Sequence, residues 1–144
     1  MLMRYVDTSV LLAFLLPEAG SDAAEQFMTS DGAPLAISAW SEVELLSALG
    51  IKLRSGQVSL AEAHSAMDAY TLSLSPHLRR LAVRDADLRL AAILLDGWAT
   101  PLRAGDGLHL AIARANNATV HTFDKAMTKA GMQLGVAVTL LEIS

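Results

Sequence analysis

The sequence predicts an α/β fold with a mainly parallel central sheet flanked by helices. Short apolar runs typical of buried strands recur at residues 2–6, 35–38, 118–123 and 136–141. Between them lie longer segments whose apolar residues have helical spacing. No repeat, low-complexity tract or linker interrupts this alternation, so we expect a single domain over residues 1–144.

The first half of the chain predicts four helices with recognisable boundary signals. Pro17 ends the first helix, and Ser38 or Ser41 caps the third, which runs to about Arg54. The fourth has apolar residues at helical intervals. The expected ranges are 8–16, 20–29, from 38 or 41 to about 54, and 59–73.

The second half of the chain predicts three more helices. Gly97 closes the first of them, and the second begins near Asp106 and reaches Asn116 and Asn117. A short strand is expected at 80–84. The expected helices cover 86–96, 106–117 and 125–130. The strand at 118–123 lies between the last two helices, and the strand at 136–141 follows the last one.

Composition limits the classes of function. The chain is 53% apolar, with a mean hydropathy of +0.39, so we expect part of its apolar surface to meet a partner or a second copy of the chain. The formal charge of −4 argues against a protein that coats nucleic acid through a basic surface. It is compatible with an enzyme that holds nucleic acid through a metal ion in an acidic pocket.

The chain has no cysteine, which excludes disulfides, thiolate catalysis and cysteine-based zinc sites and suits a cytoplasmic protein. The apolar run Val10–Leu16 is far too short to cross a bilayer. Asp7 before it, Pro17 after it and the lack of a cleavage pattern also argue against a signal peptide. We therefore expect a cytoplasmic protein that does not contact membranes.

Four acidic residues form the candidate site. Asp7 and Asp124 each follow a strand and open a helix, which places them at the carboxyl edge of a parallel sheet, where such folds bind ligands. Asp106 opens another helix after a loop. Glu44 shares a partly apolar helix face with Trp40, where a bound cation would offset its desolvation. Such carboxylates suit Mg²⁺ or Mn²⁺, which can activate a water against a phosphodiester.

Helix capping is the alternative explanation of the aspartates. Asp is a preferred N-cap residue, so Asp7, Asp106 and Asp124 could each simply cap a helix. Their joint position at the edge of the sheet favours the functional interpretation. Periodicity does not decide between Glu42 and Glu44 as the acidic residue of their helix.

Four segments, in order along the chain, resemble the motifs of PIN-domain proteins, especially the VapC toxins of bacterial toxin–antitoxin pairs. They are YVDTSVLL (5–12), ISAWSEVELLSAL (37–49), LRAGDGLHLAIA (102–113) and HTFDKAM (121–127). The glutamate of the family's second motif precedes two apolar residues, and this match selects Glu44. Gly107 departs from the family, which more often has Ala there, and weakens the start of the helix by about 1 kcal/mol.

The resemblance implies a PIN fold and a metal-dependent endoribonuclease that acts as a toxin. It implies Mg²⁺ or Mn²⁺ as cofactor, RNA as substrate, a small cognate antitoxin as inhibitor, and a homodimer. The residues it implies as both catalytic and metal-binding are Asp7, Glu44, Asp106 and Asp124.

Four further polar residues lie beside these motifs. Thr8, Ser9 and Thr122 could orient the aspartates or metal-bound waters, and capping or turn hydrogen bonds explain them equally well. His109, one helical turn after Asp106, could contact RNA or support the acidic residues. A packed, hydrogen-bonded histidine is the favoured interpretation.

Arginines and tryptophans have two interpretations each. Arg79, Arg80, Arg84 and Arg89 could form a phosphate-binding edge, but a solvated surface paired with Asp85 and Asp87 is favoured. Trp40 and Trp98 are expected in the core or an interface rather than as platforms for stacked bases.

Two other classes of function fit the sequence less well. A phosphatase of the haloacid-dehalogenase class would need a second aspartate two positions after Asp7, where this chain has Ser9. A PIN-like domain that only binds RNA or a partner is the non-enzymatic alternative. All four acidic positions are filled, which favours an active enzyme.

Overall fold

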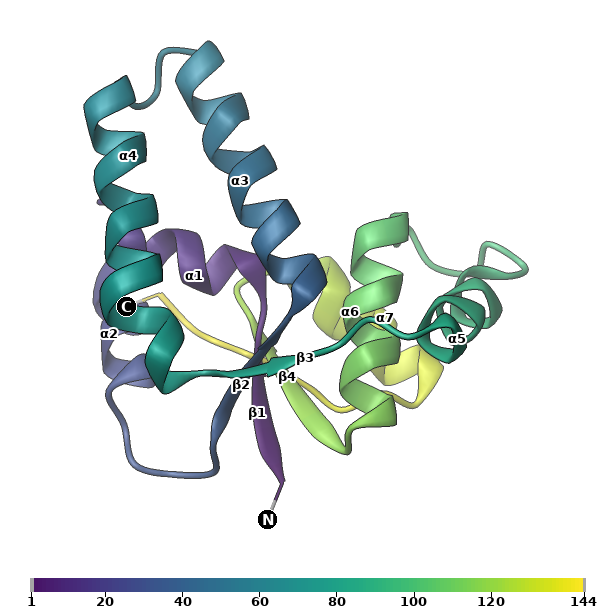
Figure 1. Cartoon of the computed structure of the whole chain (residues 1–144). Coiled ribbons are helices and arrows are strands. Elements are labelled where there is room, and N and C mark those ends of the chain that lie inside the picture. The colour runs from purple at the N-terminus through teal and green to yellow at the C-terminus, as the bar shows by residue number, and fades with distance from the viewer. Residues whose placement is uncertain (1, 144) are drawn as a thin grey trace.

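A computed structural model describes residues 2–143 and shows a five-stranded sheet in the order β3-β2-β1-β4-β5 (Figure 1). Each neighbouring pair of strands is parallel. The strands are β1 (Met3–Val6), β2 (Leu35–Ser38), β3 (Arg79–Leu81), β4 (Ala118–Thr122) and β5 (Val138–Leu140). The predicted parallel sheet is confirmed.

Helices connect the strands. They are α1 (Thr8–Leu15), α2 (Ser21–Met28), α3 (Ala39–Arg54), α4 (Leu60–Ala69), α5 (Asp85–Leu95), α6 (Ala104–Ala115) and α7 (Lys125–Leu134). A π-helical turn (Tyr70–Leu74) and a short 3₁₀ turn (Ser75–His77) follow α4 and lead into β3. Helices α3 and α4 lie side by side and project beyond the sheet as an arm (Figure 1).

The sheet is covered on both faces because its strands are apolar on both. Tyr5 and Val6 are neighbours on β1, so their side chains point to opposite faces. Val6 packs in a cluster with side chains of α1 to α4, whereas Tyr5 packs with side chains of α5, α6 and α7. The expected layering of helices about the sheet is therefore confirmed.

Several helix boundaries differ from those predicted. Helix α4, expected to reach residue 73, ends at Ala69, where the π-helical turn begins. Helix α6 begins at Ala104, so Asp106 does not open it but lies in its first turn. The Asp106 carboxylate reaches back to accept the backbone N–H of Arg103, the N-cap residue, at 3.4 Å. Helix α7 continues past residue 130 to Leu134 and ends at Gly135, which takes the left-handed conformation with φ 72°.

The start of α3 decides between the two predicted caps. The Ser38 hydroxyl accepts the backbone N–H of Ser41, and the Ser41 hydroxyl accepts that of Ser38. Ser38 is thus the N-cap residue, and Ser41 closes a reciprocal box with it. Both side chains are fully buried, so this box fixes α3 firmly to the end of β2.

Gly107 allows α5 and α6 to approach closely. A Cβ on Gly107 would lie 3.1 Å from Cγ of Leu95, closer than packed carbons normally come. The departure from alanine at this position therefore matches the packing of this pair of helices. No helix within residues 2–143 is both long enough and apolar enough to cross a membrane.

Candidate active site

The site lies where the strand order changes direction. The chain adds β2 and β3 on one side of β1 and then places β4 on the other side. In open parallel sheets such a point leaves a crevice at the carboxyl ends of the two central strands. Asp7 directly follows β1, and Asp124 follows β4 by two residues. A backbone bond from Asp7 N–H to the His121 carbonyl, 3.0 Å, joins the two strand ends.

Asp7 does not use its side chain as a helix cap. It stands at the N-cap position of α1, but its carboxylate makes no capping bond. Instead, Oδ2 accepts the hydroxyls of Ser9 at 2.7 Å and Thr122 at 2.8 Å. Oδ1 lies 3.9 Å from Nε2 of His109. The carboxylate is buried, oriented by two hydroxyl donors and turned toward the crevice, so capping does not explain it.

Asp124 does cap a helix. Its Oδ1 accepts the backbone N–H groups of Ala126 at 2.8 Å and Met127 at 3.1 Å, at the start of α7. The capping interpretation is therefore correct for one of its oxygens. These bonds also hold the carboxylate at the rim of the crevice, because α7 begins there.

Glu44 points into the site and Glu42 does not. Glu44 Oε1 accepts the Thr8 hydroxyl at 2.7 Å and is hydrogen-bonded to Nε2 of His109. Burial acts to raise the pKa of Glu44, but the bonds from His109 and Thr8 outweigh it and hold that pKa below its usual value. Glu42 lies elsewhere on α3, where it accepts the hydroxyl of Tyr70 and pairs with Arg80.

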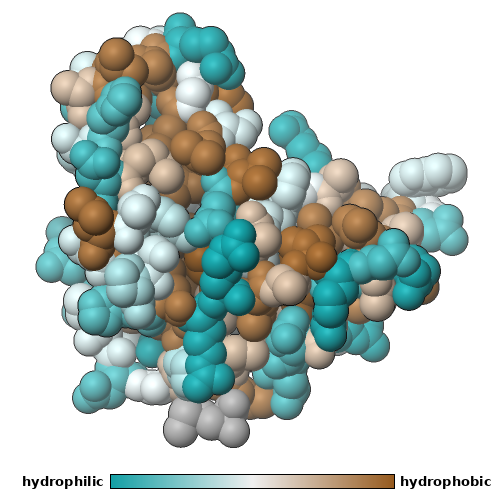
Figure 2. Space-filling model, in the orientation of Figure 1, coloured by the Kyte–Doolittle hydropathy of each residue, from teal (hydrophilic) through white to brown (hydrophobic). Residues whose placement is uncertain are grey.

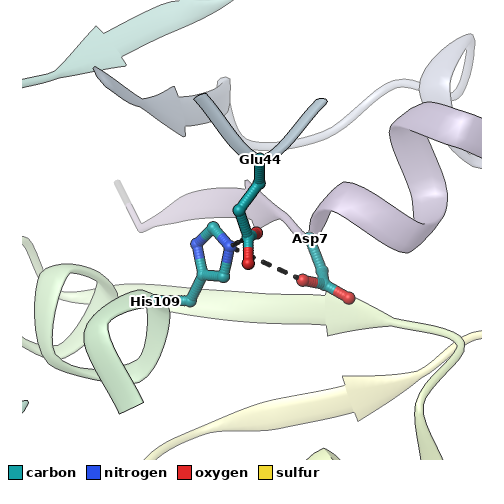
Figure 3. Close-up of side chains that lie close together, drawn as sticks. All are labelled: Asp7, Glu44 and His109. Carbon is teal, nitrogen blue, oxygen red and sulfur yellow. Dashed lines mark hydrogen bonds and ion pairs between the residues drawn. The ribbon is translucent and has the colours of Figure 1, made fainter. Parts of the chain in front are cut away.

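The four predicted carboxylates share one cavity. A hollow of about 350 Å³ is lined by Asp7, Glu44, Asp106 and Asp124, together with Thr8 and Ser9. Its neighbour, of about 550 Å³, is lined by three of the four and by Trp40 and Arg103. The tightest set is smaller: within residues 2–143, Asp7, Glu44 and His109 bring one ligand atom each within 4.8 Å of one another (Figure 3).

The neighbouring carboxylates affect the pKa of Asp106. Burial raises the pKa of its carboxyl group, the backbone N–H of Arg103 partly offsets that rise, and the charges of Asp7, Asp124 and Glu44 raise it further. Negative groups that repel one another in a partly buried cavity are typical of a site that binds a cation.

Tyr5 belongs to the site although nothing in the sequence marks it. Its hydroxyl lies 2.5 Å from Nδ1 of His109 and 2.8 Å from the Ser38 hydroxyl. No motif marks this tyrosine, because a buried aromatic residue on a strand is ordinary core. His109 itself is buried and hydrogen-bonded, as the favoured interpretation held, and its partner on one side is Glu44.

The PIN domain family matches residues 4–131. The chain belongs to this family. Similar solved structures show the same fold: FitAcB from Neisseria gonorrhoeae has a TM-score of 0.75 at 21% identity, over 94% of this chain and 96% of that one. VapC20 from Mycobacterium tuberculosis, a toxin that cleaves the sarcin–ricin loop, has a TM-score of 0.71 at 20% identity, over 89% and 95%.

A third similar structure is VapBC2 from Rickettsia felis bound to a DNA fragment from their promoter. Its TM-score is 0.69 at 16% identity, over 98% of this PIN chain and all of that one. No curated protein matches this chain in sequence.

The donors in this PIN domain fit a hard divalent cation. Asp7 and Glu44 each have one oxygen held by hydroxyl or imidazole groups, and their second oxygens receive none of those bonds. Carboxylate oxygens fixed in this way suit Mg²⁺ and Mn²⁺, which need few protein ligands and keep several waters. Asp106 and Asp124 line the same cavity and would complete the acidic surroundings.

Three of the four clustered arginines are paired, and two of them pair with the expected aspartates. The pairs are Arg80 with Glu42, Arg84 with Asp87 at 3.5 Å, and Arg89 with Asp85. Trp40 packs partly buried against the cluster of α5 and α6 side chains. Trp98 is 89% exposed, which excludes the core for this residue and leaves the interface position as a prediction.

Proposed function

We propose that this PIN chain is a divalent-metal-dependent endoribonuclease and the toxin of a toxin–antitoxin pair. The observation that carries the proposal is the cavity at the carboxyl ends of β1 and β4, which Asp7, Glu44, Asp106 and Asp124 all line. PIN domains are generally nucleases, which supports hydrolysis of a nucleic acid. The similar VapC20 is a toxin that cleaves the sarcin–ricin loop, which supports RNA as the substrate class.

The proposed cofactor is Mg²⁺ or Mn²⁺, held by Asp7, Glu44, Asp106 and Asp124. Such an ion lowers the pKa of a bound water and neutralises the leaving oxygen of a phosphodiester. The chain's own groups hold the carboxylates in place: Thr122 and Ser9 for Asp7, and the first turn of α7 for Asp124. Because these donors are fixed in the fold, the site needs little rearrangement to bind the ion.

The proposed partners are a small antitoxin and a second copy of the chain, in the cytoplasm. Apolar side chains gather on the α3–α4 arm (Figure 2), where Val43, Leu46, Ile51 and Leu60 are each more than half exposed. Such surface is typical of protein contacts. An arginine of the antitoxin near the acidic cavity would suit its carboxylates. Light scattering should show at least a dimer at micromolar concentration, and a clean monomer would contradict the dimer.

Cleavage of a structured RNA by the purified chain tests the activity. We expect cutting with Mg²⁺ or Mn²⁺ and none after a chelator. Asp7→Asn and Asp106→Asn should each lower the rate by orders of magnitude, with the fold confirmed by circular dichroism. Asp85→Asn is the matched control, because Asp85 is exposed and pairs with Arg89 on the surface. Equal cleavage in chelator would overturn the metal mechanism, and full activity of both site variants would overturn the site.

A further inference from the structure

His109, in the core, links strand β1 to helix α3 through hydrogen bonds to one residue of each. Its imidazole is fully buried, and the Tyr5 hydroxyl of β1 lies on one nitrogen. Glu44 of α3 is hydrogen-bonded to the other nitrogen (Figure 3). A buried histidine needs a hydrogen-bond partner for each ring nitrogen, and many kinds of group can be that partner. Here one partner is a carboxylate of the proposed metal site.

For a neutral ring, the hydrogen-bond partners decide which nitrogen carries the proton. A bond between Nε2 and a carboxylate oxygen requires a hydrogen on Nε2, because ionised Glu44 only accepts. In the neutral ring Nδ1 is then an acceptor, so Tyr5 donates its hydroxyl hydrogen to it at 2.5 Å. The Tyr5 oxygen can still accept from the Ser38 hydroxyl at 2.8 Å.

The same bonds fix the orientation of Glu44. His109 and Thr8 both donate to Oε1, which directs Oε2 away from them. On the Oε2 side the chain has Gly105, where an added Cβ would lie 2.7 Å from Oε2 and 3.3 Å from the Trp40 ring. The carboxylate is therefore confined, with one oxygen saturated by donors and the other beside a residue without a side chain.

We propose that His109, with its tautomer fixed by Tyr5, is a positioning residue that holds Glu44 Oε1 and thereby presents Oε2 to the metal. The inference rests on the proposed function, since it assigns a role toward the same metal site. His109 as a direct ligand is the competing role. It would require an unprotonated Nε2, which would lose the bond to Glu44.

Direct titration of Mn²⁺ into the metal-free chain, followed by electron paramagnetic resonance, measures the effect without any RNA. Removing a group that orients a metal ligand typically weakens affinity about 10–100-fold. We expect His109→Leu to show a loss in this range. His109→Gln, which retains a donor, should recover part of it. In a Glu44→Gln background His109→Leu should cause no further loss, because the oriented carboxylate is already gone.

Tyr5→Phe tests the far end of the chain of bonds and keeps the buried ring. It should weaken Mn²⁺ binding several-fold. Tyr70→Phe is the matched control, because it removes another tyrosine hydroxyl bonded to an α3 glutamate, Glu42, and should leave Mn²⁺ binding unchanged. Equal losses in both variants, or none in either, would overturn the inference. Tyr5→Phe thus also decides the matter if His109→Leu does not fold.

Nitrogen-15 NMR of the His109 ring gives an independent readout. We expect a protonated Nε2 and an unprotonated Nδ1 in the metal-free chain, with the same tautomer after a diamagnetic ion such as Mg²⁺ is added. A proton on Nδ1 with direct coordination through Nε2 would overturn the positioning role. If the parent chain binds no Mn²⁺ at all, the proposed metal-dependent function fails. If it binds and His109→Leu binds equally well, only this inference fails.

Discussion

Thr122 donates its hydroxyl hydrogen to Asp7 across 2.8 Å and so joins the end of β4 to the end of β1. The same oxygen accepts the backbone N–H of Asp124 at 3.0 Å. One buried hydroxyl thus orients one acidic residue of the site and fixes the backbone of another. Both interpretations that the sequence left open therefore apply to Thr122: its hydroxyl orients Asp7, and the bond it accepts from the Asp124 N–H is an ordinary turn bond.

Thr122→Val should therefore destabilise the chain and impair the site together. Losing a buried hydrogen bond to a charged group costs about 1–3 kcal/mol. We expect a lower free energy of unfolding in urea and weaker Mn²⁺ binding. Thr119→Val on the same strand is the control, because Thr119 is only partly buried and should show neither change. Unchanged Mn²⁺ affinity in Thr122→Val would mean that this hydroxyl stabilises the fold but has no role in metal binding.

Glu44→Gln and Glu42→Gln should differ sharply in activity. Glu44 lines the acidic cavity, so its replacement should abolish most RNA cleavage and weaken Mn²⁺ binding. Glu42 pairs with Arg80, whose side chain is 55% exposed, so its replacement should cost under about 1 kcal/mol of stability and leave cleavage intact. Cleavage rates and urea melts of both variants check this. The reverse ranking would mean that the acidic residue of this helix is Glu42.

The order of the predicted strands and helices along the chain was enough to predict the parallel sheet and part of the site. Alternating apolar runs and helical segments indicate a parallel sheet, and an aspartate that follows a strand in such a sheet must lie at its carboxyl edge. Asp7 and Asp124 do lie at that edge, just after the ends of β1 and β4. The order of the elements gave no means of choosing between Glu42 and Glu44, because both lie on a helix whose rotation about its axis is set by packing.

Other features depend on contacts that the local sequence does not encode. Tyr5 and His109 are 104 positions apart, and nearly all of the middle of α6 is buried, so no polar face marks which side of it meets Glu44. The start of α6 was misplaced because Arg103 is not a typical cap residue. The predicted helix at 125–130 is shorter than α7, because Gly131 is a poor helix former. In the structure Gly131 lies inside α7, where its lack of a side chain allows tight packing against Val138.

His121 should make stability depend on pH below neutrality. Burial, and then the charge of Arg4, lower the pKa of His121 from 6.5 to about 4. Its ring packs on Phe27, with 4.6 Å between ring centroids. The unfolded chain therefore binds the proton more readily, so this contribution to stability is complete above pH 6.5 and is lost as the pH falls toward 4.

His121→Phe keeps an aromatic ring on Phe27 and cannot take up a proton. Thermal melts between pH 7 and pH 4 should show the parent losing a few degrees more than this variant. Replacing the exposed His77 by Gln should leave the parent's pH dependence unchanged. Parallel curves for the parent and His121→Phe would show that His121 is protonated equally in the folded and unfolded chain.

Asp106→Asn should stabilise the metal-free chain. The pKa of Asp106 is raised, so its ionisation near neutral pH opposes folding, and this cost appears as the pH rises above the usual value of 3.8. Asn removes the charge from the neighbourhood of Asp7, Asp124 and Glu44 but keeps an oxygen for the Arg103 N–H. In chelator the variant should melt a few degrees above the parent.

Added Mn²⁺ should reverse the order of the two melting temperatures. An ion that binds only the folded chain stabilises it, and the parent has one more carboxylate to bind with. The parent should therefore gain several degrees in millimolar Mn²⁺, and Asp106→Asn much less. Asp85→Asn, which removes an exposed carboxylate, should follow the parent in both conditions. Identical melting temperatures of the parent and Asp106→Asn, with and without Mn²⁺, would mean that this carboxylate only supports the first turn of α6 through its bond from the Arg103 N–H, which the Asn oxygen can also accept.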